Sequence, residues 1–221
     1  MAPPAFLRAV AYGHYQGRMK EAIHALKYER VHPAARGLGR MLAAAMAKLA
    51  EEAPAELLVV PVPLHRAKYA ERGFNQARAL AGYAIEELVK THPTWRLKLA
   101  PAALMRQRAT ASQAGLSPRE RRLNVRGAFV VEDASAVADK DILLVDDILT
   151  TGATVRAASQ ALMKAGARSV WVATLARARR EFDGGEVPAD EEWRETEMAG
   201  DVPAAVMENA SVQSSMNQPS F

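Results

Sequence analysis

Apolar side chains recur at helical spacing in the first fifty residues. Two such stretches follow one another, and in each the apolar positions return after three or four residues, as on one face of a helix. The pattern therefore predicts two helices that pack on a core within residues 14–50. The core positions are Met19, Ala22, Ile23 and Leu26 in the first helix, and Leu38, Met41, Leu42, Ala45, Met46 and Leu49 in the second.

Short apolar runs of strand length alternate with further helical stretches in residues 56–176. Helical spacing returns over residues 74–90 and again from residue 155. Strands that alternate with helices predict an α/β fold with a mostly parallel sheet flanked by helices. The predicted strands cover residues 57–62, 96–100, 128–131, 141–145 and 169–175.

Composition agrees with a soluble protein. The 221 residues are 49% hydrophobic, which is enough for one substantial core, and this length allows one domain or at most two. Neither the N-terminus nor any later segment has an apolar run of signal or membrane-spanning length, so we expect neither secretion nor membrane insertion. The sequence has no cysteine, which is consistent with a reducing cytoplasm and excludes a zinc site made of thiolates. We therefore expect a cytoplasmic protein without zinc; its oligomeric state is left open.

Charge is distributed unevenly along the chain. Residues 181–221 hold ten acidic residues and one basic residue, Arg194, for a net charge of −9, which leaves +13 on residues 1–180. The acidic segment is poor in aromatic residues and cannot bury enough surface to order itself, so we predict a folded domain over 1–180 and a disordered tail over 181–221. A basic domain implies an anionic partner, either a polyphosphate or a nucleic acid.

One segment carries most of the candidate chemistry, Ile142-Leu-Leu-Val-Asp-Asp-Ile-Leu-Thr-Thr-Gly-Ala-Thr154. An apolar strand ends in two carboxylates, and a turn rich in hydroxyl groups then leads into a helix. Ligands bind at the carboxyl ends of parallel strands, and the start of a helix offers free N–H groups to an anion. We expect Gly152 to adopt a positive φ and let the backbone approach a phosphate. The predicted phosphate-binding residues are Thr150, Thr151, Gly152, Ala153 and Thr154.

The two carboxylates of this segment have a different role. Asp146 and Asp147 would repel a phosphate, but they suit ribose hydroxyls or a hydrated Mg²⁺, which one or two carboxylates hold together with substrate oxygens and water. The alternative is an ordinary strand end followed by a helix cap, but a cap needs fewer acidic and hydroxyl side chains than this segment contains. A nucleoside triphosphatase of the P-loop class is excluded, because the chain has no Gly-Lys dipeptide.

Two basic segments are candidates to bind the rest of a polyanion. The first, after the strand that ends near Val62, forms a loop at a strand's carboxyl end and carries His65, Arg66, Lys68 and Arg72. The second, residues 105–126, has six arginines and no apolar periodicity, which fits a mobile lid, although residues 119–122 could instead begin a helix after Ser117-Pro118. The candidates in this lid are Arg106, Arg108, Thr110 and Gln113.

These motifs resemble a known family. The 142–154 segment looks like the phosphoribosyl-pyrophosphate (PRPP) motif of type I phosphoribosyltransferases. The segments 61–76, which contains Arg-Gly-Phe-Asn-Gln, 106–113 and 124–129 are similar to the ComF branch, whose members are associated with competence. The resemblance covers about residues 12–176. ComF proteins typically begin with a four-cysteine zinc ribbon, and this chain departs from that pattern.

The resemblance implies a type I phosphoribosyltransferase-like fold and a role for each segment. It makes residues 63–72 the pyrophosphate loop and residues 105–126 the flexible loop. The implied reaction transfers the phosphoribosyl group of PRPP to an unknown acceptor with Mg²⁺ and releases pyrophosphate, with Asp146, Asp147, Arg106 and Arg108 as catalytic residues. A non-catalytic protein that senses PRPP or assists DNA uptake is the alternative. At most weak nucleic-acid binding is expected.

Overall fold

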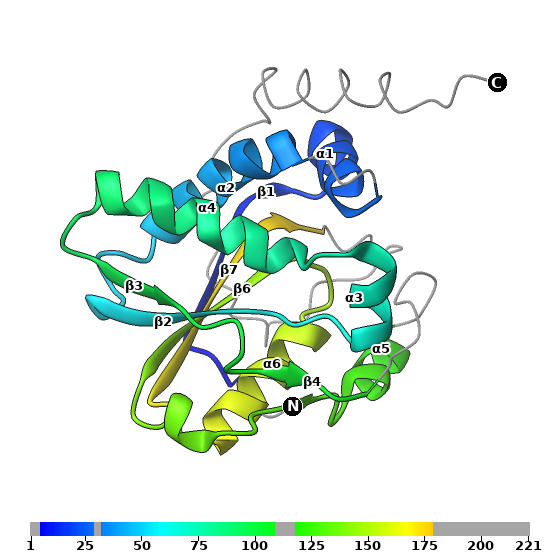
Figure 1. Cartoon of the computed structure of the whole chain (residues 1–221), viewed down its shortest axis with the longest axis vertical. Helices are drawn as coiled ribbons and strands as arrows, with labels where there is room; N and C mark the ends of the chain where they lie inside the picture. The colour runs from blue at the N-terminus through cyan, green and yellow to red at the C-terminus, as the bar shows by residue number, and fades with distance from the viewer. Residues whose placement is uncertain (1–4, 29–31, 109–117, 179–221) are drawn as a thin grey trace, which may run out of the picture.

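A five-stranded sheet forms the centre of the protein. The computed structural model describes residues 5–28, 32–108 and 118–178. Within these residues every neighbouring pair in the sheet is parallel, in the order β1-β7-β6-β2-β3 (Figure 1). All five strands therefore end at the same edge. The strands are β1 (Arg8–His14), β2 (Glu56–Pro61), β3 (Arg96–Leu99), β6 (Asp141–Leu149) and β7 (Ser169–Arg177).

Helices cover both faces of this sheet. In β2, Leu57 and Val59 face one core, whereas Leu58 and Val60 face the other, because successive side chains of a strand alternate. The first core is completed by α1 (Gly17–Tyr28), α2 (His32–Ala47) and α4 (Gln76–Thr91), and the second by α6 (Ala153–Lys164) and residues around β4 and β5. Burial on both faces explains why the strands read as continuous apolar runs. No helix among the described residues is long and apolar enough to cross a membrane.

The α/β fold with a mostly parallel sheet flanked by helices is confirmed, with three differences in its strands. The apolar pattern does not predict β1, an edge strand with only a few buried positions. The strand predicted to end at residue 145 continues to Leu149 as β6. The predicted strand 128–131 lies outside the main sheet, because β5 (Phe129–Val130) pairs antiparallel with β4 (Met105–Arg106) in a separate two-stranded sheet.

Both basic segments contain a helix that apolar periodicity did not reveal. The loop expected at residues 63–72 includes α3 (Arg66–Arg72), which buries no residue and is defined by its ends. The His65 side chain accepts a hydrogen bond from the Ala67 N–H, and Gly73, with φ 79°, ends the helix in the left-handed region. In the arginine-rich segment the helical alternative is correct, since α5 spans Pro118–Val125. The predicted tail 181–221 lies outside the described residues.

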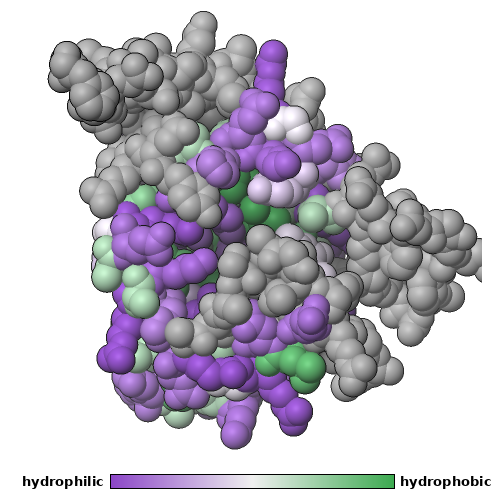
Figure 2. All heavy atoms as spheres, turned by 90° about the vertical axis from the view of Figure 1, so that its right-hand side faces the viewer, coloured by the Kyte–Doolittle hydropathy of each residue, from purple (hydrophilic) through white to green (hydrophobic). Residues whose placement is uncertain are grey.

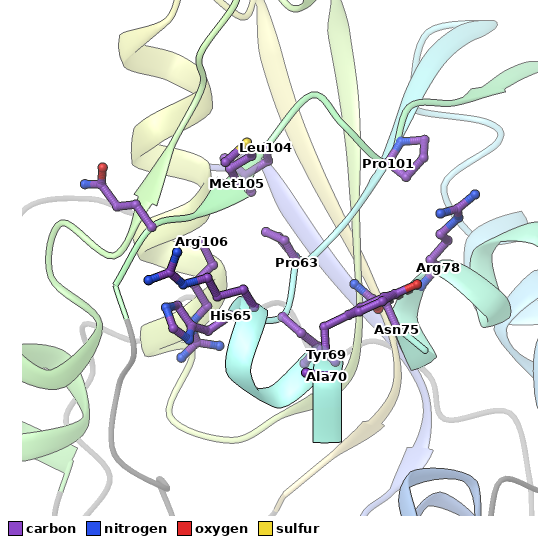
Figure 3. Close-up of a pocket in the computed structure, with 13 residues that line it drawn as sticks. Pro63, His65, Tyr69, Ala70, Asn75, Arg78, Pro101, Leu104, Met105 and Arg106 are labelled. Carbon is purple, nitrogen blue, oxygen red and sulfur yellow. Dashed lines mark hydrogen bonds between the residues drawn. The ribbon is translucent and has the colours of Figure 1, made fainter. Parts of the chain in front are cut away.

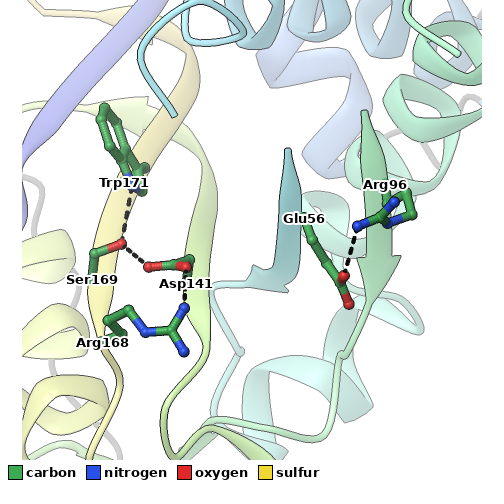
Figure 4. A network of polar contacts seen from close by, with 6 residues as sticks. All are labelled: Glu56, Arg96, Asp141, Arg168, Ser169 and Trp171. Carbon is green, nitrogen blue, oxygen red and sulfur yellow. Dashed lines mark hydrogen bonds and ion pairs between the residues drawn. The ribbon is translucent and has the colours of Figure 1, made fainter. Parts of the chain in front are cut away.

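A polar network fixes the amino ends of β6 and β7, opposite the edge where the strands end. Asp141 is nearly buried and accepts hydrogen bonds from Ser169 Oγ at 2.6 Å and from an Arg168 amino group at 3.0 Å (Figure 4). Trp171 Nε1 in turn donates to Ser169 Oγ at 3.1 Å. These two hydrogen bonds offset the free energy that the Asp141 carboxylate loses when it leaves water. The network therefore holds the start of the central strands in register.

Helices α2 and α4 pack unusually closely where they cross. A Cβ added to Gly39 of α2 would lie 2.3 Å from Tyr83 Cβ of α4 and 3.4 Å from the Ala84 backbone nitrogen. Gly39 is therefore required for the contact between the two helices. Gly82, on α4, is its unconstrained counterpart, because a Cβ added there would have no neighbour within 4 Å.

We predict that Gly39→Ala destabilises the protein and Gly82→Ala does not. At position 39 the new methyl group meets backbone and Cβ atoms, and such overpacking costs about 1–3 kcal/mol, which exceeds the gain of roughly 1 kcal/mol from replacing a helical glycine by alanine. At position 82 only that gain remains. Urea unfolding of both variants measures the difference, and equal stability of the two would contradict the close approach of α2 and α4.

Candidate functional site

The predicted acidic pair lies on the last part of β6, at the edge where the parallel strands end. Asp146 pairs in register with Thr174 of β7. The Asp147 backbone N–H donates to Asp146 Oδ1 at 2.9 Å, which holds the Asp146 carboxylate against the main chain of the next residue. Asp147 is 5% exposed, and Asp146 is partly exposed. The strand therefore presents two neighbouring carboxylates at the edge where ligands of parallel sheets bind.

Burial and charge repulsion act together on this pair. Burial, reinforced by the nearby charge of Asp147, raises the pKa of Asp146 well above the usual range of an aspartate. A cation beside the pair would reverse this effect, because it stabilises the ionised form. The site is thus built to gain from a bound cation.

Lys27 supplies such a cation, although no pattern in the sequence predicts this role. This residue lies in the last turn of α1, and its Nζ is 2.5 Å from Asp147 Oδ2. Both side chains are largely buried, with 19% of the Lys27 side chain and 7% of the Asp147 side chain exposed. Burial lowers the pKa of Lys27, but the nearby Asp147 carboxylate, together with Asp146, outweighs it and raises the pKa overall, so the lysine is charged. Its position next to the core residue Leu26 gave no signal of this role.

The turn after the acidic pair has the geometry expected of an anion-binding loop. Gly152 adopts φ 73°, which confirms the predicted positive φ, and α6 begins at the next residue, Ala153. The Ala153 N–H donates only a long bond of 3.4 Å to Thr151 Oγ1, and Gly152 makes no side-chain cap. Because α6 begins four residues after β6 ends, the start of this helix, with its backbone N–H groups that lack helical acceptors, follows directly on the strand that carries the acidic pair.

The first basic segment divides into residues that face a cavity and residues that do not. A cavity of about 640 Å³ lies between α3 and the chain before and along β4, and His65 and Arg66 line it (Figure 3). Lys68 is exposed on α3 outside this lining, and Arg72 donates a hydrogen bond to Gln76 Oε1 at 2.8 Å. These side chains differ in position because residues 66–72 form a helix, and successive side chains of a helix point in different directions around its axis.

Arg106 is the residue of the second basic segment that lines this cavity. Its guanidinium lies over the ring of Phe129, 5.4 Å from the ring centroid, so the β4–β5 pairing fixes its position. Burial lowers the pKa of Arg106 from its ordinary value, while the charge of Asp146 acts in the opposite direction. This influence places the arginine within electrostatic reach of the acidic pair.

Arg108 has a different position. It is exposed, and its guanidinium donates to the Asn124 and Arg126 carbonyls at 3.0 and 2.8 Å. Those carbonyls lie at the end of α5, where backbone acceptors lack helical partners, so the arginine ties β4 to this helix. Thr110 and Gln113 lie outside the described residues.

Other side chains in the cavity wall were not predicted. Tyr69 is half exposed, Asn75 caps α4 by accepting from the Arg78 N–H at 3.1 Å, and Asn75 Nδ2 donates to the Val62 carbonyl at 3.0 Å. The Asn75 bonds join the end of β2 to the start of α4. Asn75 directly precedes a run of apolar residues at helical spacing, and an asparagine at that place is typical of a helix N-cap. The remaining wall is formed by Pro63, Leu64, Ala70, Arg78, Pro101, Leu104, Met105 and Gln107.

The face that carries these segments is mostly hydrophilic. Figure 2 shows the side of the molecule on which α3 and α5 lie, and polar residues dominate its described surface. A hydrophilic, cationic surface beside a buried acidic pair suits a ligand that carries both negative charge and hydroxyl groups. The geometry thus places a carboxylate pair, a helix start and the basic side chains of a cavity at one end of the sheet.

Comparison with known proteins gives several matches. Residues 96–195 match the family model described as a phosphoribosyl transferase domain. The chain is 34% identical over 177 residues to the DNA utilization protein YhgH of Escherichia coli (strain K12), over 79% of this chain and 74% of that protein. It is 30% identical over 178 residues to competence protein F of Haemophilus influenzae, over 79% and 75% of the two chains.

A solved structure of the allosteric regulatory enzyme of purine biosynthesis is also similar, at 24% identity and a TM-score of 0.38, over 65% of this chain and 25% of that chain. The match to the phosphoribosyl transferase model includes β6, the turn at Gly152 and α6. The chain therefore belongs to the ComF family of competence-associated, type I phosphoribosyltransferase-like proteins.

Proposed function

We propose that the protein binds PRPP with Mg²⁺ and transfers its phosphoribosyl group to an acceptor, with release of pyrophosphate. The observation that carries this proposal is the acidic pair of β6, followed by the left-handed Gly152 and the start of α6 at the carboxyl edge of a parallel sheet. Each part of PRPP has a group of suitable chemistry at this edge.

The 5-phosphate is assigned to the turn from Thr150 to Thr154. Gly152 lets the main chain approach the phosphate, because no side chain intervenes and its φ of 73° is accessible to glycine at little cost. N–H groups at the start of α6 and the neighbouring threonine hydroxyls donate to the phosphate oxygens, and the positive end of the helix dipole adds to the attraction.

The ribose hydroxyls and the metal are assigned to the acidic pair. Within the described residues no group of three or more His, Cys, Asp and Glu side chains could hold a metal ion. Two carboxylates nevertheless fit Mg²⁺, because this ion keeps several waters and completes its shell with substrate oxygens. When bound, Mg²⁺ would neutralise charge on the pyrophosphate. Asp146 and Asp147 would hold it, mainly through substrate and water, and orient the ribose.

The pyrophosphate is assigned to the cationic side of the cavity. His65, Arg66 and Arg106 line it, and the ring of Phe129 holds the Arg106 guanidinium in place. Fixed cations near the leaving oxygens stabilise negative charge as the bond to the anomeric carbon breaks. The acceptor forms its new bond to the same carbon, and catalysis consists of orientation and charge stabilisation, without a nucleophile from the protein.

A non-catalytic role that uses PRPP as a signal, or assists DNA uptake, is the second candidate. It is supported by the names of the relatives, a DNA utilization protein and a competence protein, and by the net charge of +13 on residues 1–180. Release of pyrophosphate from PRPP in the presence of a panel of nitrogen acceptors separates the candidates. Release with one acceptor supports a transferase, whereas PRPP binding without release with any of them supports a sensor.

We predict that Asp146→Asn weakens Mg²⁺-dependent binding of PRPP at least tenfold. The substitution keeps the size of the side chain and removes the charge that attracts a cation. Isothermal titration with PRPP, with and without Mg²⁺, should show a loss of at least tenfold in affinity, which corresponds to about 1.4 kcal/mol. Asp139→Asn is the matched control, because Asp139 is exposed at the other end of β6 and its φ of 56° is well tolerated by asparagine. Equal affinity in wild type and Asp146→Asn would contradict the assignment.

Arg106→Ala and Arg108→Ala should have different effects. We expect Arg106→Ala to weaken PRPP binding by roughly tenfold to a hundredfold, because it removes charge-assisted hydrogen bonds to the pyrophosphate. Arg108→Ala should lower the melting temperature, since the Asn124 and Arg126 carbonyls lose their donor. Titration and thermal unfolding of both variants test this separation, and unchanged PRPP affinity in Arg106→Ala would exclude its role in binding pyrophosphate.

If the basic surface instead serves DNA, affinity should depend on many weak phosphate contacts. Binding of a single-stranded oligonucleotide would then fall steeply with salt through counterion release and change little in Arg106→Ala. We expect only weak, salt-sensitive DNA binding, measured by fluorescence anisotropy at several salt concentrations. Submicromolar binding at physiological salt that PRPP does not reduce would favour the DNA-uptake role.

A further inference from the structure

The ion pair between Lys27 and Asp147 places a cation from α1 in the acidic motif of β6. These residues lie far apart in the sequence, and packing of α1 on the sheet brings them together. Their separation of 2.5 Å and their burial distinguish the pair from the exposed Arg96–Glu56 pair, whose side chains are 73% and 74% exposed (Figure 4). A buried pair is screened little by solvent, so its charges act strongly on their surroundings.

The charge of Lys27 lies beside both carboxylates. Its ammonium contacts Asp147 directly, and Asp146 is the next residue of the strand. One negative charge of the acidic pair is thus balanced within the protein before a ligand arrives.

A divalent cation that approaches the pair meets this ammonium. The metal would have to share Asp147 with Lys27, and two cations within a few ångströms repel each other strongly in a partly buried site. The negative charge of PRPP would offset this repulsion.

We propose that Lys27 is a positioning residue which occupies Asp147 as an internal cation, keeps the empty acidic pair from binding a divalent metal tightly, and thereby makes metal entry depend on PRPP. The part that concerns PRPP rests on the proposed function, whereas the suppression of metal binding does not. The lysine is suited to this role because its single charge sits on a flexible chain.

The experiment measures binding of Mn²⁺ alone by electron paramagnetic resonance, with the full chain and no PRPP. Lys27→Gln removes the charge and keeps a hydrogen-bond donor, so we expect it to bind Mn²⁺ about tenfold more tightly than wild type, because the repulsion is gone. Lys27→Arg keeps the charge and should remain as weak as wild type. Lys20→Gln, at an exposed position of the same helix, is the matched control and should also remain as weak.

Unchanged or weaker Mn²⁺ binding in folded Lys27→Gln would overturn the proposal, as would equally tight binding in Lys27→Arg or Lys20→Gln. If Lys27→Gln does not fold, the double variant Lys27→Gln/Asp147→Asn tests whether the lysine compensates the charge of Asp147. This variant removes the Asp147 charge together with the lysine, so no unpaired carboxylate remains at position 147. Recovery of the wild-type melting temperature and weak Mn²⁺ binding in the double variant would support charge compensation, and failure to recover would contradict it.

A separate titration with PRPP distinguishes this inference from the proposed function. In wild type, PRPP should increase Mn²⁺ affinity at least tenfold, and in Lys27→Gln the increase should be smaller, since the metal site is already available. If PRPP has no effect on any variant while Lys27→Gln still binds Mn²⁺ more tightly, the PRPP assignment fails and the role of Lys27 in suppressing metal binding stands.

Discussion

The parallel pairing of β6 with β2 on one side and β7 on the other is the constraint on which the candidate site depends. Val145 lies opposite Pro61 of β2, and the pairing with β7 continues to Leu149. Because both neighbours run in the same direction as β6, the segments that follow β2 and β6 leave the sheet at the same edge. The basic segment at His65 and the turn at Gly152 therefore both follow strands that end at this edge, although they are far apart in the chain. A fold of this kind supports many functions, so the function has to be decided at this edge.

This arrangement has an electrostatic cost, because it places two carboxylates next to each other, and one of them, Asp147, is buried. An uncompensated charge in such a place is strongly unfavourable, and a pair of like charges is more so. The protein offsets the cost with Lys27 beside Asp147 and with the charge of Arg106 near Asp146. The two cations come from different elements, α1 and β4, so the electrostatic balance of the site depends on the whole fold.

The basic segments show how local structure selects among similar side chains. Arg66 and Arg106 line the cavity, whereas Arg108 is bound to carbonyls at the end of α5 and Lys68 points to solvent. All four are cations in segments of similar composition. Their different positions follow from the turns of α3 and from the β4–β5 pairing, which orient each side chain separately.

The sequence by itself determined the α/β class, most of the strands and the turn at Gly152, because these follow from local periodicity and from backbone preferences within a few residues. It did not reveal β1, α3 or the antiparallel placement of β5, since short edge strands and exposed helices have little apolar pattern. The tertiary structure alone decided that Lys27 neutralises Asp147 and that Arg106, but not Arg108, faces the cavity. Contacts of this kind depend on how distant elements pack, and no spacing along the chain encodes which charged side chains will meet.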